Sequence, residues 1–349
     1  MALNQTRAPD SLCLLRLSAI GDVTHILPII ATLRQQWPNT KISWIIGSTE
    51  YSLVKSLPGI EFIVFNKGNG FREYARLRKK LAGRSFDMLF MMQVSLRANL
   101  ISLNIKARRR IGFDKARSHD MHYYFCNEHI EGPSRVHVLD GFFQFLQKAG
   151  IQSRNMDWLL HTSADDKAFA NSVINRPHCV IVNPCSSVRR NNFRNWSQRR
   201  YAEVIDYLLN KGTQVILTGG PAQGEIEFVQ EIEQLCQGKP DNMTGKTTLP
   251  QLLALLQQAD CMIAPDTGPA HMATIADTPA IGLFASSNPL RSGPYKSQQI
   301  LINAYPEALL KYKNKTPDQA RWGERVRVPE VMDIITVDQL IKKVDECLI

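Results

Sequence analysis

The sequence predicts an α/β protein built from two doubly wound parallel-sheet domains. Short, apolar, β-rich runs alternate with amphipathic helical stretches along its 349 residues, which is typical of parallel sheets with helices on both faces. A chain of this length is too long for one core, so two domains are expected. A strand–turn unit near the start, LCLLRLSAIGD, resembles a second one, CVIVNPCSS, that follows residue 178.

The expected strands and helices alternate in chain order within each domain. We expect strands at residues 12–17, 42–46, 61–65 and 87–92, and then at 179–183, 214–218, 261–264 and 280–284. We expect amphipathic helices at 23–36, 72–82, 136–149, 198–211, 223–236, 248–258, 268–277 and 336–348.

A linker at residues 161–177 separates a domain at 1–160 from a domain at 178–325. In this linker Ser163, followed three residues later by Asp166, predicts the capped start of a short helix. Residues 326–349 carry the last helix, which we expect to pack back on the first domain. Ligands of doubly wound sheets bind outside the carboxyl ends of the strands, so we expect the site in the cleft that the two domains share.

Cysteine usage and hydropathy indicate a cytoplasmic protein. The seven cysteines are scattered and form no CxxC pair, which favours free thiols in a reducing compartment over a disulfide framework or a zinc site. The apolar run at 12–30 is interrupted by Arg16 and Asp22 and is followed by no small-residue cleavage site. No other stretch reaches the ~18 apolar residues of a spanning helix. We therefore expect no integral membrane segment.

The net positive charge lies entirely in the first half of the chain. Residues 1–150 carry 21 Lys and Arg against 11 Asp and Glu, whereas the remainder carries 21 of each. Two clusters dominate this excess, FREYARLRKKLAGR at 71–84 and KARRRIGFDKAR at 106–117. Either cluster alone could be a solvated surface. Two in one half indicate an anionic partner for the first domain.

The most informative stretch of the second domain is CMIAPDTGPAHMATIAD, residues 261–277. A strand ends before Asp266-Thr267-Gly268-Pro269, which turns into a helix. Gly268 leaves room for a ligand, and Pro269 suits a first helical turn because it lacks an amide proton. The free amides of Thr267, Gly268 and Ala270 then form an anion site fit for a diphosphate. The alternative is that Asp266 merely caps the helix.

Two further strand ends of this domain are polar. The stretch NPCSSVRRNNFRNWS at 183–197 supplies Ser186, Ser187, Arg189, Arg190 and Arg194, and guanidinium groups bind phosphate oxygens in pairs. The stretch LTGGPAQGE at 217–225 supplies Glu225, which could reach a ribose hydroxyl, and Met243 lies where it could flank a base. Together these ends predict a nucleotide site. The dehydrogenase and P-loop glycine patterns are absent from the sequence.

In the first domain, SAIGD places a carboxylate between a buried strand and a helix. Gly21 permits a sharp turn there. Asp22 then follows the carboxyl end of the first strand, where we expect it to face the nucleotide site. The alternative is that Asp22 caps the helix at 23–36.

These stretches together resemble the family 9 glycosyltransferases, the ADP-heptose:lipopolysaccharide heptosyltransferases. The matching pieces are LRLSAIGDVTHILPIIATLRQQWP, KARRRIGF, RNWSQRRYAEVI, and APDTGPAHMATIADTPAIGLF with NPLRSGPY. The resemblance implies a GT-B fold of two Rossmann-like domains facing across a cleft, with acceptor bound by the first and ADP-heptose by the second. It implies inverting, metal-independent transfer without a cofactor. The heptosyltransferase I branch is the most similar, which implies Kdo-lipid A as acceptor, its Kdo plain or phosphorylated, at the cytoplasmic face of the inner membrane.

The resemblance also implies residue roles. Asp22 matches the family's general base. The donor-binding residues would be Ser186, Ser187, Arg194, Glu225, Met243, Asp266, Thr267, Gly268, Pro269, Ala270 and His271, and the acceptor-binding residues Gly21, Arg72, Arg76, Arg109 and Arg110. Arg194 departs from the family pattern, since other members commonly have Lys before an aromatic-proline pair, and the loop at 186–194 is longer than theirs.

Two alternatives remain open at this point. Another nucleotide-sugar enzyme of the same architecture, with a different sugar or acceptor or acting as an epimerase, would share the nucleotide site. A non-enzymatic nucleic-acid binder would explain the charge, but the basic clusters lack interleaved stacking aromatics, and the chain has no helix-turn-helix or zinc pattern.

Overall fold

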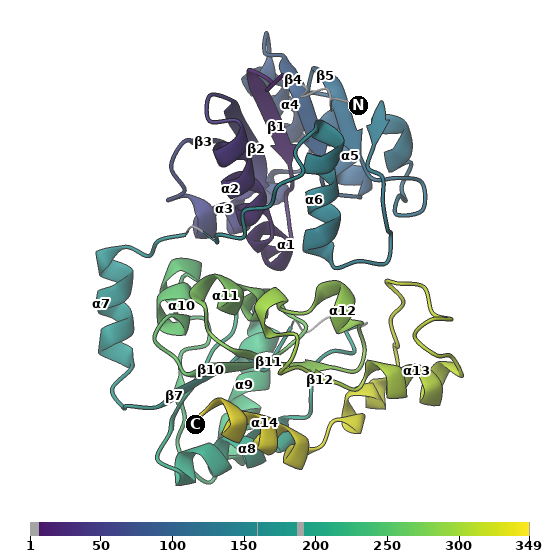
Figure 1. Ribbon diagram of the computed structural model, residues 1–349. Coiled ribbons are helices and arrows are strands. Elements are labelled where there is room, and N and C mark those ends of the chain that lie inside the picture. Colours follow the sequence, from purple (N-terminus) through teal and green to yellow (C-terminus); the bar gives the residue numbers. More distant parts are fainter. Residues whose placement is uncertain (1–6, 159, 187–191, 349) are drawn as a thin grey trace. The chain divides into compact units, whose positions relative to one another are not determined.

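The computed structural model describes residues 7–158, 160–186 and 192–348. The chain divides into two compact units, Met1–His161 and Thr162–Ile349. Each unit is built on one six-stranded sheet whose neighbouring strands all run parallel (Figure 1). The predicted α/β class, with two doubly wound parallel sheets, is confirmed.

The first unit has the strand order β3-β2-β1-β4-β5-β6. Its strands are β1 Ser11–Leu15, β2 Lys41–Gly47, β3 Ile60–Phe65, β4 Phe86–Met91, β5 Ala107–Gly112 and β6 Glu128–His129. Its helices are α1 Ile20–Thr24, α2 Ile26–Gln36, α3 Ser48–Val54, α4 Phe71–Leu81, α5 Leu96–Ser102 and α6 Val138–Ala149, with the short 3-10 helices η1 Lys67–Asn69 and η2 His122–Phe125. The central strand β1 is apolar because helices cover both of its faces.

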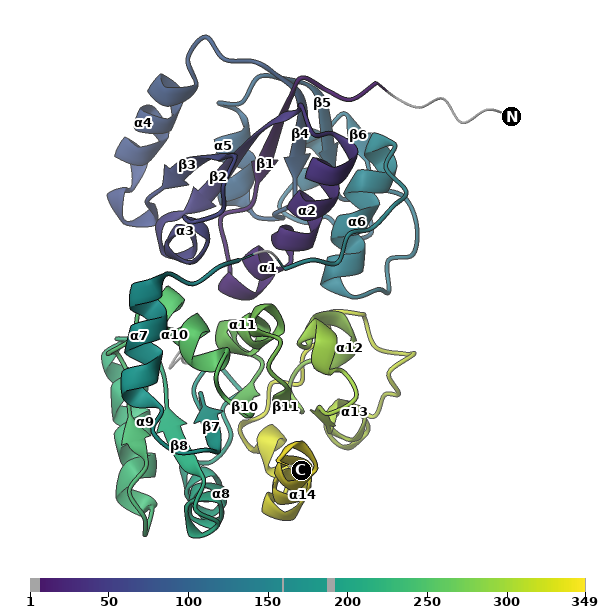
Figure 2. The same cartoon turned by 60° about the vertical axis from the view of Figure 1, so that its left-hand side comes forward.

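Different helices cover the two faces of this sheet. Successive residues of β4 point to opposite faces and show which helices lie on each. Leu89 joins a buried cluster with Leu77 of α4 and Ile101 of α5. The centre of the Phe90 ring lies 5.8 Å from that of Phe145 on α6. Helix α2 packs beside α6 (Figure 2). Helices α4 and α5 therefore share one face, and α2 and α6 share the other.

The second unit has the strand order β12-β11-β10-β7-β8-β9. Its strands are β7 Cys179–Val182, β8 Gln214–Leu217, β9 Asp241–Asn242, β10 Cys261–Pro265, β11 Ala280–Phe284 and β12 Ile302–Asn303. Its helices are α7 Ala164–Val173, α8 Gln198–Asn210, α9 Gln223–Leu235, α10 Leu249–Leu256, α11 Gly268–Ala276, α12 Pro289–Ser292, α13 Tyr305–Lys313 and α14 Val337–Cys347, with the 3-10 helices η3 Tyr295–Ser297 and η4 Pro329–Ile334.

The segment that we expected to link the domains contains α7, which packs against α10 of the second unit. Its predicted cap is present, since the Asp166 N–H donates to Ser163 Oγ at 3.1 Å and the Ser163 hydroxyl donates to the Asp166 carboxylate at 2.6 Å. The segment is therefore an ordered helix of the second unit.

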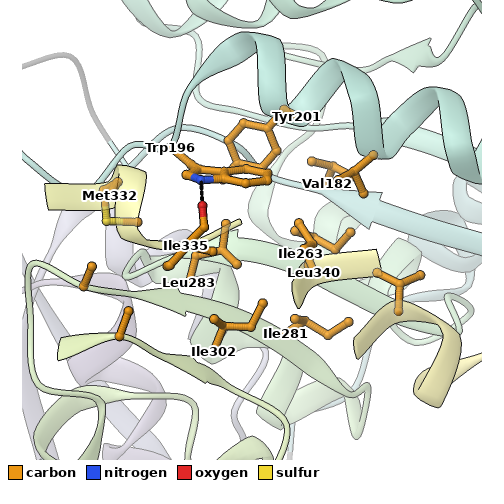
Figure 3. Close-up of a cluster of buried hydrophobic side chains, with 14 of the residues drawn as sticks. Val182, Trp196, Tyr201, Ile263, Ile281, Leu283, Ile302, Met332, Ile335 and Leu340 are labelled. Atoms are coloured by element: carbon orange, nitrogen blue, oxygen red, sulfur yellow. Dashed lines mark hydrogen bonds between the residues drawn. The ribbon is translucent and has the colours of Figure 1, made fainter. Parts of the chain in front are cut away.

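The apolar face of the last helix is buried in the second unit. Leu340 and Val344 of α14 join the core cluster formed by the second sheet and α8 (Figure 3). Just before the helix, the Trp196 indole N–H donates to the carbonyl oxygen of Ile335 at 3.1 Å. Our expectation that this helix packs back on the first domain is corrected, because its own sheet already buries the apolar stripe.

Several elements of the first unit differ from the prediction, and α3, α5 and β6 were not among the expected elements. The helix expected at 23–36 is two helices, α1 and α2, which meet at His25. The basic stretch at 107–112 forms strand β5, which we did not predict because its three consecutive arginines hide the strand pattern. None of the helices in the described ranges has both the length and the apolar character that crossing a bilayer requires.

Candidate active site

Asp22 lies beyond the carboxyl end of β1, in the first turn of α1. Its side chain is 31% exposed. The carboxylate Oδ2 accepts the Ala19 N–H at 3.3 Å and forms an ion pair with Arg16. Asp22 is thus the third residue of α1 and helps to cap this helix through Ala19, although it is not the N-cap of the helix that we expected at 23–36. The accessible carboxylate is available for chemistry.

Arg16 holds this carboxylate from a buried position. Its side chain is only 12% exposed, and it follows directly on β1. One of its Nη groups donates to the Met92 carbonyl beyond β4, and its guanidinium carbon lies 5.4 Å from the centre of the Phe142 ring on α6. Because three elements fix the guanidinium, the orientation of the Asp22 carboxylate is fixed with it.

In the second unit, a network of hydrogen bonds follows the end of β7. Ser186 donates from its N–H and its hydroxyl to Asn195 Oδ1, at 2.9 and 3.0 Å, and accepts from Asn192 Nδ2 at 2.7 Å. Arg194 donates from Nε to Asn192 Oδ1 at 3.1 Å and from Nη1 to the Asp266 carbonyl oxygen at 2.8 Å. The network therefore joins the ends of β7 and β10 and aims Arg194 at the start of α11.

Asp266 is buried between this arginine and a serine. The Ser287 hydroxyl, beyond β11, donates to Asp266 Oδ2 at 2.9 Å, and Arg194 Nη1 lies 3.6 Å from the same oxygen. The N-cap of α11 is Thr267, whose side chain makes no capping hydrogen bond. The alternative in which Asp266 caps the helix is therefore wrong. An uncapped helix start beside a guanidinium group is suited to an anion.

The ends of β8 and β9 lie next to this network and carry two further residues that we predicted to bind the donor, Glu225 and Met243. Glu225 accepts the Gly220 N–H at 2.8 Å. A Cβ atom at Gly219 would lie 3.0 Å from Thr244 Cγ2, and one at Gly220 would lie 2.9 Å from the Glu225 carboxylate. Met243 is half-buried at the end of β9. The backbone of this turn therefore passes close to the side chains of Thr244 and Glu225.

For several residues that we predicted to bind the donor, the structure gives a position but no contact that supports the role. Pro269 lies in the first turn of α11, as the sequence indicated, and His271, two residues further on, is buried. The roles of Gly268, Ala270 and His271 stay predictions. Ser187, Arg189 and Arg190 lie outside the described residues.

Two arginines that we predicted to bind the acceptor have partners inside the first unit. Arg109 forms a two-pronged ion pair with Glu128, at 2.7 and 2.8 Å, which lowers the pKa of that carboxyl. Arg110 donates to the carbonyl oxygens of Phe125 and Ile105, both at 2.8 Å, and burial lowers its pKa. These side chains hold β5 to its neighbours. Their predicted roles toward an acceptor stay predictions.

Arg72 and Arg76 are exposed on α4, and Arg76 lies 3.5 Å from the buried Glu73. Gly21 is buried within α1. Their roles toward an acceptor stay predictions. Among the residues that our sequence reasoning missed, Arg16 carried a signal, because it is the one charge inside an apolar strand-like run.

Comparison with known proteins identifies the family of the chain. The profile of Glycosyltransferase family 9 (heptosyltransferase) matches residues 74–320. The lipopolysaccharide core heptosyltransferase OpsX of Haemophilus influenzae is 38% identical over 337 residues, covering 96% of each chain. Lipopolysaccharide heptosyltransferase 3 of Escherichia coli K12 is 26% identical over 77% of this chain and 80% of its own.

Solved structures share the fold. A family 9 glycosyltransferase of Veillonella parvula superposes with a TM-score of 0.78 at 21% identity, over 97% of both chains. E. coli heptosyltransferase WaaC with ADP superposes with a TM-score of 0.73 at 16% identity, over 97% of this chain and 99% of that one.

These matches confirm the GT-B class and argue against an epimerase and a nucleic-acid-binding protein, whereas they leave the exact donor and acceptor to be assigned. The matched profile spans both units, and the H. influenzae relative aligns over nearly the whole chain. The chain therefore belongs to glycosyltransferase family 9, the heptosyltransferases.

Proposed function

We propose that this enzyme transfers heptose from ADP-heptose to a hydroxyl of Kdo in the lipopolysaccharide inner core. The assignment of the donor rests on one observation: Arg194 and Asp266 lie together at the uncapped start of α11. A guanidinium group and a helix start bind a diphosphate, and a carboxylate beside them accepts hydrogen bonds from sugar hydroxyls. The names of the relatives, a lipopolysaccharide core heptosyltransferase and WaaC with ADP, support the same donor and pathway.

The donor side would stabilise the departing ADP. Negative charge grows on the diphosphate as its bond to the sugar breaks, and fixed donors aimed at that charge lower the barrier. Arg194 and the first amides of α11 are those donors, and Ser186, whose hydroxyl donates to Asn195, holds the loop that carries Arg194. Because they supply positive charge themselves, we propose metal-independent transfer. Glu225 would accept from a ribose hydroxyl, and Met243 would contact the base.

Asp22 would act as the general base toward the acceptor. As the Kdo hydroxyl attacks the anomeric carbon, Asp22 takes its proton, and a single displacement inverts the configuration of the sugar. Positioned bases of this kind typically contribute ~10²–10⁴-fold. The contacts with Arg16 and Ala19 both go to Oδ2, so we assign Oδ1 to the acceptor proton.

The basic first unit would bind the anionic acceptor. Arg72 and Arg76 are exposed near the start of α4, which follows the carboxyl end of β3. Carboxylates of Kdo, and a phosphate where Kdo carries one, are suitable partners for them. The acceptor is a lipid, so we place the enzyme at the cytoplasmic face of the inner membrane as a peripheral protein.

Substitution of Asp22 tests the proposal. We expect Asp22→Asn and Asp22→Ala to lower kcat by at least ~10²-fold while ADP affinity stays within about twofold of wild type. Asp10→Asn, at an exposed carboxylate of the same unit, is the matched control. Near-normal turnover of Asp22→Ala would show that the base is another group. ADP release is measured with and without Kdo-lipid A, because an epimerase needs no acceptor.

A further inference from the structure

The first unit exposes an unusual group of apolar side chains. Of the ten large apolar side chains that are exposed in the described ranges, six lie on or beside α5 and η2. We call them the α5–η2 patch: Leu96 (57% exposed), Leu100 (42%), Leu103 (68%), Met121 (68%), Tyr123 (36%) and Tyr124 (77%). Scattered apolar residues are normal on a protein surface, whereas a contiguous group indicates a binding surface.

Helix α5 is apolar on two opposite sides. Ala98 and Ile101 point into the core cluster beneath the sheet, whereas Leu96 and Leu100 are four residues apart on the outer side. Leu103 follows the helix and continues the outer row. The inner side packs in the core, whereas the outer row of leucines is exposed.

Hydrogen bonds fix η2 beside α5. The Leu96 N–H donates to Asp120 Oδ2 at 3.2 Å, and Asn99 Nδ2 donates to the Asp120 carbonyl oxygen at 2.7 Å. His122 Nδ1 lies 3.0 Å from Asn99 Oδ1. The patch is therefore preformed, with Met121 held next to the start of α5.

The neighbouring helix on the same face of the sheet is strongly cationic. Helix α4 exposes five positive side chains, Arg72, Arg76, Arg78, Lys79 and Lys80. Its only acidic residue, Glu73, is buried. Phe71 at its first position is 93% exposed, and Arg97 on α5 adds another exposed cation. An apolar patch next to a row of cations is the composition of a surface that binds anionic membranes.

We propose that the outer face of α4, α5 and η2 docks on an anionic phospholipid bilayer. The leucines and Met121 enter the boundary of the acyl chains, and the tyrosines lie at headgroup level. Arg78, Lys79 and Lys80 of α4 contact the phosphates, which leaves Arg72 and Arg76 to the acceptor. A second copy of the chain is a poor occupant, because a symmetric dimer through this face would bring two rows of cations together. The inference deepens the proposed function by naming the surface with which the enzyme reaches a lipid acceptor.

Sedimentation with vesicles tests the surface on the full-length enzyme. We expect binding to vesicles of phosphatidylcholine with phosphatidylglycerol, weaker binding to phosphatidylcholine alone, and a loss of the difference at high salt. The triple variant Leu96→Ser/Leu100→Ser/Leu103→Ser should bind at least about tenfold more weakly. Arg78→Gln/Lys79→Gln/Lys80→Gln should bind anionic vesicles about 100-fold more weakly. The matched control is Leu235→Ser/Leu310→Ser, at residues 47% and 61% exposed in the second unit.

Two results would overturn the inference. One is unchanged vesicle binding by the leucine variant; the other is a wild-type dimer, detected by light scattering, that the leucine variant abolishes while vesicle binding stays absent. Transfer to a deacylated, water-soluble acceptor is measured in parallel, and we expect the wild type and the leucine variant to be equally active. Vesicle binding without any heptose transfer would contradict the proposed function and leave the docking surface supported.

Discussion

Substitution of Arg194 tests the donor site quantitatively. Its side chain is 23% exposed, and it bridges Asn192 and the Asp266 carbonyl oxygen through two hydrogen bonds. Arg194→Ala removes the cation that we assign to the diphosphate and leaves the buried Asp266 carboxylate with Ser287 as its described hydrogen-bond donor. Arg194→Lys retains the charge but cannot reproduce the planar fork that reaches both partners.

The expected loss follows from the charges involved. Two unit charges about 4 Å apart interact by about 4 kcal/mol at the effective dielectric of a protein surface site. One charge-assisted hydrogen bond contributes about 1.5–3 kcal/mol. We therefore expect Arg194→Ala to weaken ADP binding by about 10- to 1000-fold, and Arg194→Lys by roughly tenfold.

Isothermal titration calorimetry with ADP measures this loss directly. Arg199→Ala is the matched control, because Arg199 is 85% exposed on α8 and pairs with Glu203 within its own helix. Circular dichroism confirms that each variant is folded. An Arg194→Ala enzyme that binds ADP like the wild type would refute the assignment of this guanidinium group to the diphosphate.

Three further predictions concern the general base, the metal and pH. Arg16→Gln should lower kcat about 10- to 100-fold with little change in KM for ADP-heptose, and Arg16→Lys should recover most of that loss. Equal losses of kcat in both variants would mean that Arg16 is only structural. Transfer should persist after dialysis against EDTA, because Arg194 and α11 supply the charge for the diphosphate, and a loss that Mg²⁺ restores would contradict this. Burial lowers the pKa of His122 from 6.5 to about 4, so the unfolded chain takes up a proton between these values that the folded protein does not. The free energy of unfolding should therefore decrease as pH falls from about 6.5 to 4, and less steeply for His122→Asn; identical slopes would show that another group titrates.

The sheets could be predicted because their strands are buried on both faces. A run such as residues 12–15 is apolar throughout, and a strand covered on both faces has this pattern whichever side chains pack against it. Strand β5 escaped prediction because Arg109 and Arg110 lie on it with internal partners that the sequence does not display. The sequence did not display these partners when we predicted that the two residues bind the acceptor, and that role stays a prediction.

The sequence predicted which polar residues follow the strands, but it did not predict the contacts that these residues make. Position after a buried strand selected Asp22, Ser186 and Asp266, since the carboxyl ends of parallel strands meet at one edge of a sheet. Whether Asp266 caps α11 or pairs with Arg194 depends on a loop that returns from the end of β7. Such a contact between distant residues leaves no periodic signal in the sequence.

Incubation of the enzyme with ADP-heptose and Kdo-lipid A, followed by mass spectrometry and NMR of the lipid, is the most direct experiment. We predict a product heavier by one heptosyl unit, joined to Kdo with the anomeric configuration opposite to that of the donor, and one ADP released for each product molecule. A lipid of unchanged mass, or a product that keeps the donor's configuration, would contradict the account.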